Sequence, residues 1–346
     1  MTDPRSTDPS RPLHGALHGA LRVALLGDLV VPNLPRLRAK VDFPIEVSCV
    51  PAAAPAVERD AAIRAADAVV TTAFPWPATD AHGLRLVQVQ AAGWEKVDTA
   101  CLPATTTVCN AFGHARAAAE YALMTMLMWT HRWKAVEDDF RAGSWAWSGA
   151  VSGPFRNELN SRTVGVVGLG HMGREIASRV HAMGVRVLGC ARTAPADASA
   201  FDHVYPLAQL DAFLTQCDFV ILAIALTPET TALIDARRLG LMRRDAVLVN
   251  LARGPVVEER ALYEALTGGT IAGAVIDVWW RYPSASDPSP RPSDFPFHTL
   301  PNVMMTPHSS QWTEQMMDRR WDMVVSNLRR LHRGEPLADV VRAGRA

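Results

Sequence analysis

The sequence contains little lysine and no excess of charge of either sign. Only Lys40, Lys96 and Lys134 are lysines, and arginine carries most of the positive charge. Lys+Arg and Asp+Glu both number 35, so the formal net charge is zero. Proteins that bind nucleic acid or anionic membranes commonly show a basic surplus. The overall charge therefore favours neither partner.

Cysteine pairs and long apolar runs are also lacking. The five cysteines are scattered, and none lies in a CxxC pair: Cys49, Cys101, Cys109, Cys190 and Cys217. No His/Asp/Glu/Cys cluster has the spacing of metal ligands, so we expect no metal. No run is long enough for a membrane span. Residues 1–18 are predicted to be a disordered lead rather than a signal peptide, and a cytoplasmic location follows.

The length and the apolar pattern indicate two α/β domains. A chain of 346 residues with 49% hydrophobic residues is long for one core. Short apolar runs alternate with helical patterns, which predicts parallel sheets covered on both faces. The first series contains predicted strands at 21–26, 45–50, 68–72 and 84–90, with a helix at 56–66. A long helix is predicted at 115–132, followed by a Gly/Ser/Trp-rich loop at 142–154.

A second α/β series follows that loop. Its predicted strands lie at 163–167, 185–190, 219–225, 246–252, 272–278 and 303–306. A Pro/Ser-rich surface segment is predicted at 283–296, and a final helix at 313–331. The sequence pattern alone does not indicate which of the two domains this last helix belongs to.

A glycine-rich loop stands between the first strand and the first helix of the second series. Thr163-Val-Gly-Val-Val precedes Gly168-Leu-Gly-His-Met-Gly173, and helical sequence begins at Arg174. Gly168 permits a tight turn, Gly170 lets backbone approach a pyrophosphate, and Gly173 lets helix pack on strand. The amides of His171 and Met172 at the helix start favour phosphate. The loop predicts a dinucleotide site.

The end of the next strand bears on which dinucleotide binds. An NAD site usually has an acidic residue there for the ribose 2′-hydroxyl. Here Ala191 is followed by Arg192 and Thr193, without a carboxylate. Arg192 can bind a 2′-phosphate, with help from Thr193; a solvated arginine at the strand end is the less favoured alternative. NADP(H) is therefore the preferred cofactor and NAD(H) the alternative.

Three further segments carry a family resemblance: Asn250-Leu-Ala-Arg-Gly-Pro-Val-Val-Glu258, Gly273-Ala-Val-Ile-Asp-Val278 and Pro301-Asn-Val-Met-Met-Thr-Pro-His308. With Ala91-Ala-Gly-Trp-Glu-Lys-Val-Asp98, Asn110, Ala119-Glu120 and Leu226-Thr-Pro-Glu-Thr230, they resemble the D-isomer-specific 2-hydroxyacid dehydrogenases, in order from about residue 23 to residue 331. The chain is similar to the glyoxylate/hydroxypyruvate reductases of this family, which have a similar Gly-Trp loop.

The resemblance implies a discontinuous architecture. A substrate domain, flavodoxin-like, would comprise residues 19–119 and 308–346, and a Rossmann NAD(P)-binding domain would comprise 120–307. It further implies that the active site lies in the interdomain cleft. The final helix would then cross back to the first unit.

The resemblance also implies site residues for interconversion of a 2-oxo acid and a D-2-hydroxy acid. Arg253 would bind the carboxylate and polarise the carbonyl, and His308 would act as acid and base. Ala92, Gly93 and Trp94 would contact the other side of the substrate, with Trp94 as a candidate apolar wall. The remaining predicted cofactor contacts come from loops at strand ends: Leu226, Thr227, Thr230, Leu251, Ala252, Asp277 and His308.

One position departs from the family pattern. The family usually has a Glu, paired with the catalytic histidine, where this chain has Tyr282 before Pro283. A tyrosine with an ordinary pKa of about 10 adds no negative charge at neutral pH. Asp287 or Asp294 could supply an acid instead, or the Tyr282 hydroxyl could orient the imidazole. The aromatic segment also resembles formate dehydrogenases, which are an alternative.

A second alternative is not an enzyme. Transcriptional corepressors that sense dinucleotides resemble this family and keep its active-site residues. The chain has no long charged low-complexity arm, which disfavours that reading. Trp145 and Trp147 in a polar loop predict an interface, and a homodimer through residues 115–132 and this loop is expected; the alternative is that both tryptophans cap their own domain. Apart from a second copy and the small acid substrate, we expect no nucleic-acid or membrane partner.

Overall fold

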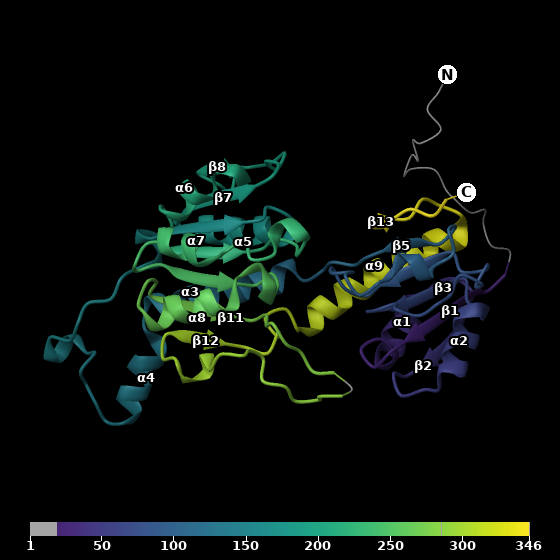
Figure 1. Ribbon diagram of the computed structural model, residues 1–346, viewed down its shortest axis with the longest axis horizontal. Helices are drawn as coiled ribbons and strands as arrows, with labels where there is room; N and C mark the ends of the chain where they lie inside the picture. The colour runs from purple at the N-terminus through teal and green to yellow at the C-terminus, as the bar shows by residue number, and fades with distance from the viewer. Residues whose placement is uncertain (1–18, 285, 346) are drawn as a thin grey trace, which may run out of the picture. The chain divides into compact units, whose positions relative to one another are not determined.

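The computed structural model of the protein describes residues 19–284 and 286–345. These residues form two compact units, the first made of residues 19–113 and 313–345 and the second of residues 114–312. Each unit is built around its own β-sheet (Figure 1). The predicted N-terminal lead falls on residues 1–18, outside the described part. The two units are presented separately below.

The sheet of unit 1 is almost entirely parallel. Its strands are β1 (Leu21–Leu26), β2 (Ile45–Val50), β3 (Ala68–Thr71), β4 (Leu86–Val89), β5 (Thr107–Cys109) and β13 (Val340–Arg342). Their order is β13-β5-β4-β3-β1-β2, and only β13 is antiparallel to its neighbour. The five parallel strands have the flavodoxin-like order. Helices α1 (Leu34–Lys40), α2 (Ala56–Ala65) and α9 (Glu314–Arg333) complete the unit.

Helix α9 belongs to unit 1 because one face of it is apolar. The face repeats at intervals of three and four residues and packs with β1, β3 and β4 in one buried cluster; its members on the helix include Met317, Trp321, Val324, Leu328 and Leu331. The Thr313 side chain caps the helix start by accepting the N–H of Met316, and Gly334 ends the helix with a φ of +67°.

The sheet of unit 2 is entirely parallel. Its strands are β6 (Thr163–Val167), β7 (Arg186–Ala191), β8 (His203–Pro206), β9 (Phe219–Leu222), β10 (Val247–Asn250), β11 (Gly273–Ile276) and β12 (Val303–Met305). The order β12-β11-β10-β9-β6-β7-β8 is that of a Rossmann fold with one added strand. Its helices are α3 (Ala115–Thr130), α4 (Trp133–Arg141), α5 (His171–His181), α6 (Leu210–Leu214), α7 (Ala236–Leu241) and α8 (Glu259–Thr267). The two parallel sheets confirm the predicted α/β fold class.

The unit boundaries differ from those expected from the sequence. The boundary between the two units lies before α3, whereas the expected boundary at residues 119 and 120 falls inside that helix. At the other end, His308 lies in unit 2 rather than with the C-terminal helix. The reason is that Thr306, Ser309 and Ser310 all donate hydrogen bonds to Asp277, at the end of β11.

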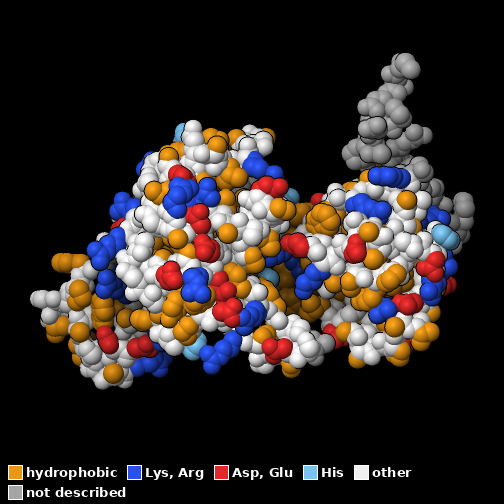
Figure 2. Space-filling view, in the orientation of Figure 1, with side chains coloured by type: hydrophobic (Ala, Val, Ile, Leu, Met, Phe, Trp, Pro, Cys, Tyr) orange, Lys and Arg blue, Asp and Glu red, His pale blue; other side chains and the backbone are white. Residues whose placement is uncertain are grey.

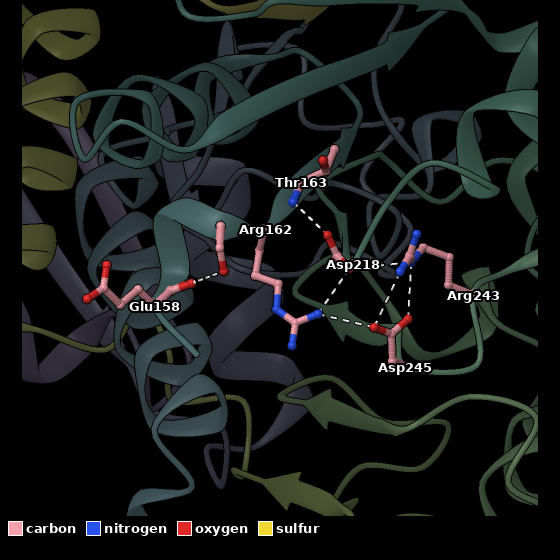
Figure 3. Close-up of polar contacts among 7 residues, drawn as sticks. Glu158, Arg162, Thr163, Asp218, Arg243 and Asp245 are labelled. Atoms are coloured by element: carbon pink, nitrogen blue, oxygen red, sulfur yellow. Dashed lines mark hydrogen bonds and ion pairs between the residues drawn. The ribbon is translucent and has the colours of Figure 1, made fainter. Parts of the chain in front are cut away.

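An ion-pair network fixes the amino ends of three strands of unit 2 (Figure 3). Asp218, just before β9, accepts the backbone N–H of Thr163 at 2.7 Å. Arg162 lies between Asp218 and Asp245, at 3.2 and 3.1 Å, and Arg243 contacts the same two carboxylates. Asp67 makes the matching contact in unit 1, accepting the N–H of Arg22 at the start of β1. These networks lie at the amino ends of the strands, opposite the edge where ligands of parallel sheets bind.

Helix α4 and the loop after it form an arm with many exposed hydrophobic side chains. The long predicted helix at 115–132 breaks at Arg132, whose φ is +50°, and α4 then begins at Trp133. Figure 2 shows hydrophobic side chains gathered on the surface of this arm, at the left of the view. The exposed members are Trp133, Phe140, Trp145, Val151 and Phe155.

Among the described residues, no helix has the length and hydropathy that a membrane crossing requires.

Candidate active site

The glycine loop has the geometry that its sequence predicts. It joins β6 to α5, and Gly168 has a φ of +94°. A Cβ on Gly168 would lie 2.5 Å from the carbonyl oxygen of Ala223, and one on Gly173 would lie 1.9 Å from that of Gly168. Nothing lies within 4 Å of the Cβ position of Gly170. Gly168 and Gly173 therefore pack tightly against neighbouring backbone, while the space beside Gly170, at the start of α5, is open. A phosphate fits in that space.

The loop lies at the point where the strand order of the sheet reverses. Strand β6 lies between β9 and β7, so the loops after β6 and β9 leave the sheet in opposite directions. The segment Leu226–Thr230 belongs to the connection after β9. Within it the Thr230 hydroxyl donates to the carbonyl of Ala225 at 2.8 Å and accepts the N–H of Thr227 at 2.7 Å. The hydroxyl of Thr230 thus holds the loop together.

Arg192 and Thr193 follow β7 and are both exposed. The pKa of the nearby Glu229 is lowered mainly by a hydrogen bond from Thr227 and to a smaller extent by the positive charge of Arg192. Arg192 and the Leu226–Thr230 segment follow β7 and β9 of one parallel sheet, so both lie at its carboxyl edge.

Arg253 follows β10 in a loop that is held from within. The side chain of Asn250 is 1% exposed, accepts the N–H of Ala252 and donates to the carbonyl of Arg253, each at 3.1 Å. An added Cβ on Gly254 would lie 2.3 Å from the carbonyl oxygen of Trp279, so this loop packs against the segment after β11. Asn250 is a supporting residue whose role the sequence did not reveal.

Asp277 ends β11 and is completely buried. Its Oδ1 accepts the Thr306 hydroxyl at 2.6 Å and the N–H of Ser309 at 2.8 Å, and its Oδ2 accepts the Ser310 hydroxyl. The N–H of Ser310 lies 3.1 Å from Oδ1. The carboxylate is therefore used to hold the loop after β12. Its predicted contact with the nicotinamide stays a prediction.

His308 lies in that loop with a φ of +57°. A non-glycine residue in the left-handed region costs roughly 1–2 kcal/mol. Strain of this kind persists only where neighbouring contacts impose it, and here the contacts are those of Asp277 on both sides of His308. Because β10, β11 and β12 are neighbours, the loops that carry Arg253, Asp277 and His308 all leave the same edge of the sheet.

Tyr282 packs its ring beside the imidazole of His308. The ring centroids are 5.6 Å apart and the planes are inclined by 58°. The Tyr282 hydroxyl accepts the backbone N–H of Trp279 at 3.1 Å, and burial raises its pKa, so the side chain adds no charge. Of the two acids considered as substitutes, Asp294 pairs with Arg281 and Asp287 closes a turn with Ser284.

The predicted substrate loop belongs to unit 1. It follows β4, and Asn110 donates to the carbonyl of Ala92 at 2.7 Å while the N–H of Ala111 donates to that of Ala91 at 3.0 Å. Trp94 is 39% exposed. Ala92, Gly93 and Trp94 thus form a supported loop at the carboxyl edge of their sheet, and their contact with substrate stays a prediction.

Comparison with known proteins identifies the family. Residues 123–310 match the model of the D-isomer specific 2-hydroxyacid dehydrogenase NAD-binding domain. A glyoxylate reductase from Pyrococcus furiosus is 34% identical over 266 residues, which cover 74% of this chain and 75% of that protein. The chain belongs to the D-isomer specific 2-hydroxyacid dehydrogenase family. It is accordingly an oxidoreductase with a nicotinamide dinucleotide as its cofactor, and its glycine loop fits that group.

Other relatives differ in length or are more distant. A D-3-phosphoglycerate dehydrogenase from Methanocaldococcus jannaschii is 34% identical over 184 residues, which cover 53% of this chain and 34% of that protein. The chain thus spans about a third of the length of that relative. An NADPH-dependent glyoxylate/hydroxypyruvate reductase from Sinorhizobium meliloti, solved with NADP and sulfate, has a TM-score of 0.74 at 25% identity, covering 94% of this chain and all of that one (100%).

Proposed function

We propose that the protein reduces a small 2-oxo acid to the corresponding D-2-hydroxy acid with a reduced nicotinamide dinucleotide, and catalyses the reverse oxidation. The observation that carries the proposal is the placement of Arg253 and His308 after β10 and β12, either side of Asp277, in the unit that holds the glycine loop. The experiment is a panel of 2-oxo acids tested with NADPH and NADH in parallel, with formate and NAD(P)⁺ as the test of the formate dehydrogenase alternative.

The residues divide the chemistry between them. The Arg253 guanidinium binds the substrate carboxylate through two parallel hydrogen bonds and polarises the neighbouring carbonyl. The His308 imidazolium donates a proton to the carbonyl oxygen, which becomes the hydroxyl. The bound reduced nicotinamide supplies the hydride that the carbonyl carbon takes up. Hydride and proton together convert the 2-oxo acid into the 2-hydroxy acid, and His308 is left neutral.

The preferred cofactor is NADP(H). Ala191 stands where an NAD-specific enzyme has an acidic residue, and Arg192, which follows it, is exposed and able to contact a 2′-phosphate. Replacing Arg192 with alanine is expected to raise the KM for NADPH about tenfold to a hundredfold, since a charge-assisted hydrogen bond is lost, and to leave the KM for NADH nearly unchanged. Steady-state kinetics with both cofactors measures this. A wild-type enzyme that favours NADH would contradict the assignment.

The Tyr282 position is expected to set the pH dependence of reduction. Reduction needs protonated His308, so the rate is present below the imidazole pKa and lost as the pH rises through it. Because Tyr282 stands where the family usually has a Glu and adds no negative charge there, we expect that loss near neutrality, close to the ordinary histidine pKa of about 6.5. The change Tyr282→Glu is expected to move the alkaline limb of kcat/KM upward by about 1–3 pH units, since a nearby carboxylate stabilises imidazolium.

The control for this experiment is Tyr282→Phe, which keeps the ring and removes only the hydroxyl. It should leave the alkaline limb in place. A wild-type enzyme that keeps its reduction rate up to about pH 9, well above the ordinary histidine value, would show that some other acid serves His308.

We propose that the protein forms a homodimer, and that α3, α4 and the loop after α4 make up the interface between the two copies. The exposed aromatic side chains of α4 and this loop include Phe155, with no burial at all, and Trp145, which is 60% exposed and packs edge-on against Phe140. Light scattering is expected to give twice the chain mass of 37.6 kDa. The double change Trp145→Ser with Phe155→Ser should give a monomer, while Val57→Ser, at an exposed apolar position of α2, should not. A wild-type monomer at micromolar concentration would end this proposal.

A further inference from the structure

A tyrosine outside the family motifs is joined to the buried Asp277. Tyr121 lies in α3, and its hydroxyl is 2.7 Å from the hydroxyl of Thr306. The Thr306 hydroxyl is in turn 2.6 Å from Oδ1 of Asp277. The three side chains therefore form a chain of hydrogen bonds that runs from α3 to the end of β11. All three belong to unit 2.

The direction of these hydrogen bonds follows from the groups at either end. An ionised carboxylate only accepts, so Thr306 uses its single proton to donate to Asp277. The Tyr121 hydroxyl must then donate to the Thr306 oxygen. Burial raises the pKa of Tyr121 above its ordinary value, so the phenol keeps the proton that this contact needs. The chain runs from Tyr121 to Thr306 to Asp277.

The Asp277 carboxylate also accepts hydrogen bonds from the residues that follow His308. Oδ2 accepts the Ser310 hydroxyl, and Oδ1 accepts the N–H of Ser309. Thr306 and Ser310 flank His308 in the sequence, two residues before it and two residues after it, so one carboxylate ties down both ends of a short loop. The Trp279 indole N–H adds a contact to the carbonyl of Thr306 at 2.9 Å.

We propose that Tyr121, acting through Thr306 and Asp277, is a positioning residue that holds His308 in its left-handed conformation for proton transfer. Tyr121 does not touch the reacting atoms. It fixes the Thr306 hydroxyl in the orientation that Asp277 accepts, and Asp277 then fixes the loop on both sides of His308. The chain has Tyr282 where the family usually has an acidic residue, and the hydrogen bonds of Tyr121, Thr306 and Asp277 hold the loop that carries His308. The inference rests on the proposed role of His308.

Three substitutions test the chain as a unit. Tyr121→Phe removes only the donor, Thr306→Val removes the middle hydroxyl at constant shape, and Thr306→Ser restores that hydroxyl. Tyr121→Phe and Thr306→Val are each expected to lower kcat for 2-oxo acid reduction about tenfold, with the KM of the cofactor unchanged, because His308 is less well placed. Thr306→Ser is expected to stay within about twofold of wild type.

The double variant distinguishes a connected chain from independent packing effects. If Tyr121 acts only through Thr306, adding Tyr121→Phe to Thr306→Val should change kcat by less than about twofold. The matched control is Tyr205→Phe, which removes a tyrosine hydroxyl that accepts a hydrogen bond from Gln216 at 2.6 Å in β8, at the opposite edge of the sheet. It should leave kcat unchanged. Two multiplicative losses in the double variant would overturn the proposal.

A measurement on the unliganded protein is independent of turnover. Amide hydrogen exchange of a peptide spanning residues 306–312 should be faster in Tyr121→Phe than in wild type and unchanged in Tyr205→Phe. Unchanged exchange in Tyr121→Phe would overturn the positioning role. A wild-type enzyme that turns over no 2-oxo acid would instead count against the proposed function, and the exchange experiment would still decide whether Tyr121 holds the loop.

Discussion

Replacing His308 with glutamine is expected to lower kcat for 2-oxo acid reduction by about two to four orders of magnitude, the usual contribution of a positioned general acid. Glutamine keeps a polar side chain of similar length but has no ionisable proton to give to the carbonyl oxygen. Cofactor binding should persist, because the glycine loop lies in a different connection of the sheet. Single-turnover kinetics under saturating cofactor measures the effect.

The matched control for His308 is His298→Gln. His298 lies in the turn before β12, whereas His308 lies in the loop after it, so the two histidines flank opposite ends of the same strand. The control should keep wild-type kcat. A His308→Gln enzyme that keeps kcat within about threefold of wild type would show that another group supplies the proton, since loss of a general acid costs far more.

Replacing Arg253 with glutamine is expected to lower kcat/KM for the 2-oxo acid by about 10²–10³, since the group that polarises the carbonyl and binds the carboxylate is lost. Arg253→Lys should recover only part of this loss because a lysine cannot form two parallel hydrogen bonds with a carboxylate. The KM of the cofactor should stay the same. Initial rates at varied substrate concentration separate these quantities.

Arg243→Gln is the matched control for Arg253. Arg243 precedes β10 and Arg253 follows it, so the control removes the same charge at the other end of the same strand. Arg243 pairs with Asp218 and Asp245 (Figure 3) and is 48% exposed, and exposed ion pairs contribute about 0–1 kcal/mol of stability. The control should lose a little stability and no activity. Equal losses of kcat/KM in both variants would contradict the role of Arg253.

The parts of the fold that follow local rules could be predicted. Strands β1, β2 and β6 have the predicted bounds. Strands β1 and β6 are buried over most of their length and read as apolar runs, whereas the edge strand β2 alternates between apolar and polar residues. The glycine loop was predictable from the spacing of its motif: Gly168 and Gly173 leave no room for a Cβ, and Gly170 leaves the start of α5 open. Helix α9 was predictable as a helix, and its apolar stripe explains why it packs on the sheet of unit 1.

Other elements could not be found in this way. Strands β5 and β13 are three residues long and pair with each other at one edge of their sheet, so neither carries enough pattern to stand out. Strand β8 is partly exposed and contains His203 and Pro206. The break between α3 and α4 depends on the left-handed conformation of Arg132. The sequence at the break contains no glycine or proline from which it could be predicted.

The supporting residues of the site were hidden for a different reason. Thr306 and Ser310 stand beside His308 in the sequence, but their function depends on Asp277, about thirty residues away. Tyr121 is more distant still, in a helix whose sequence is mostly apolar. Polar side chains on an apolar helix are a weak signal until the fold shows which buried group they face.

The central claim, that the protein is a D-specific 2-oxo acid reductase, is tested most directly by the identity of its product. A 2-oxo acid that the panel identifies as a substrate, and whose reduced form is chiral, is incubated with the preferred reduced cofactor, and the product is resolved by chiral chromatography while cofactor oxidation is followed. We predict equal amounts of cofactor oxidised and D-2-hydroxy acid formed, in wild type and in His298→Gln, and neither in His308→Gln over the same time. Formation of the L-isomer, or cofactor oxidation without a 2-hydroxy acid, would contradict the account.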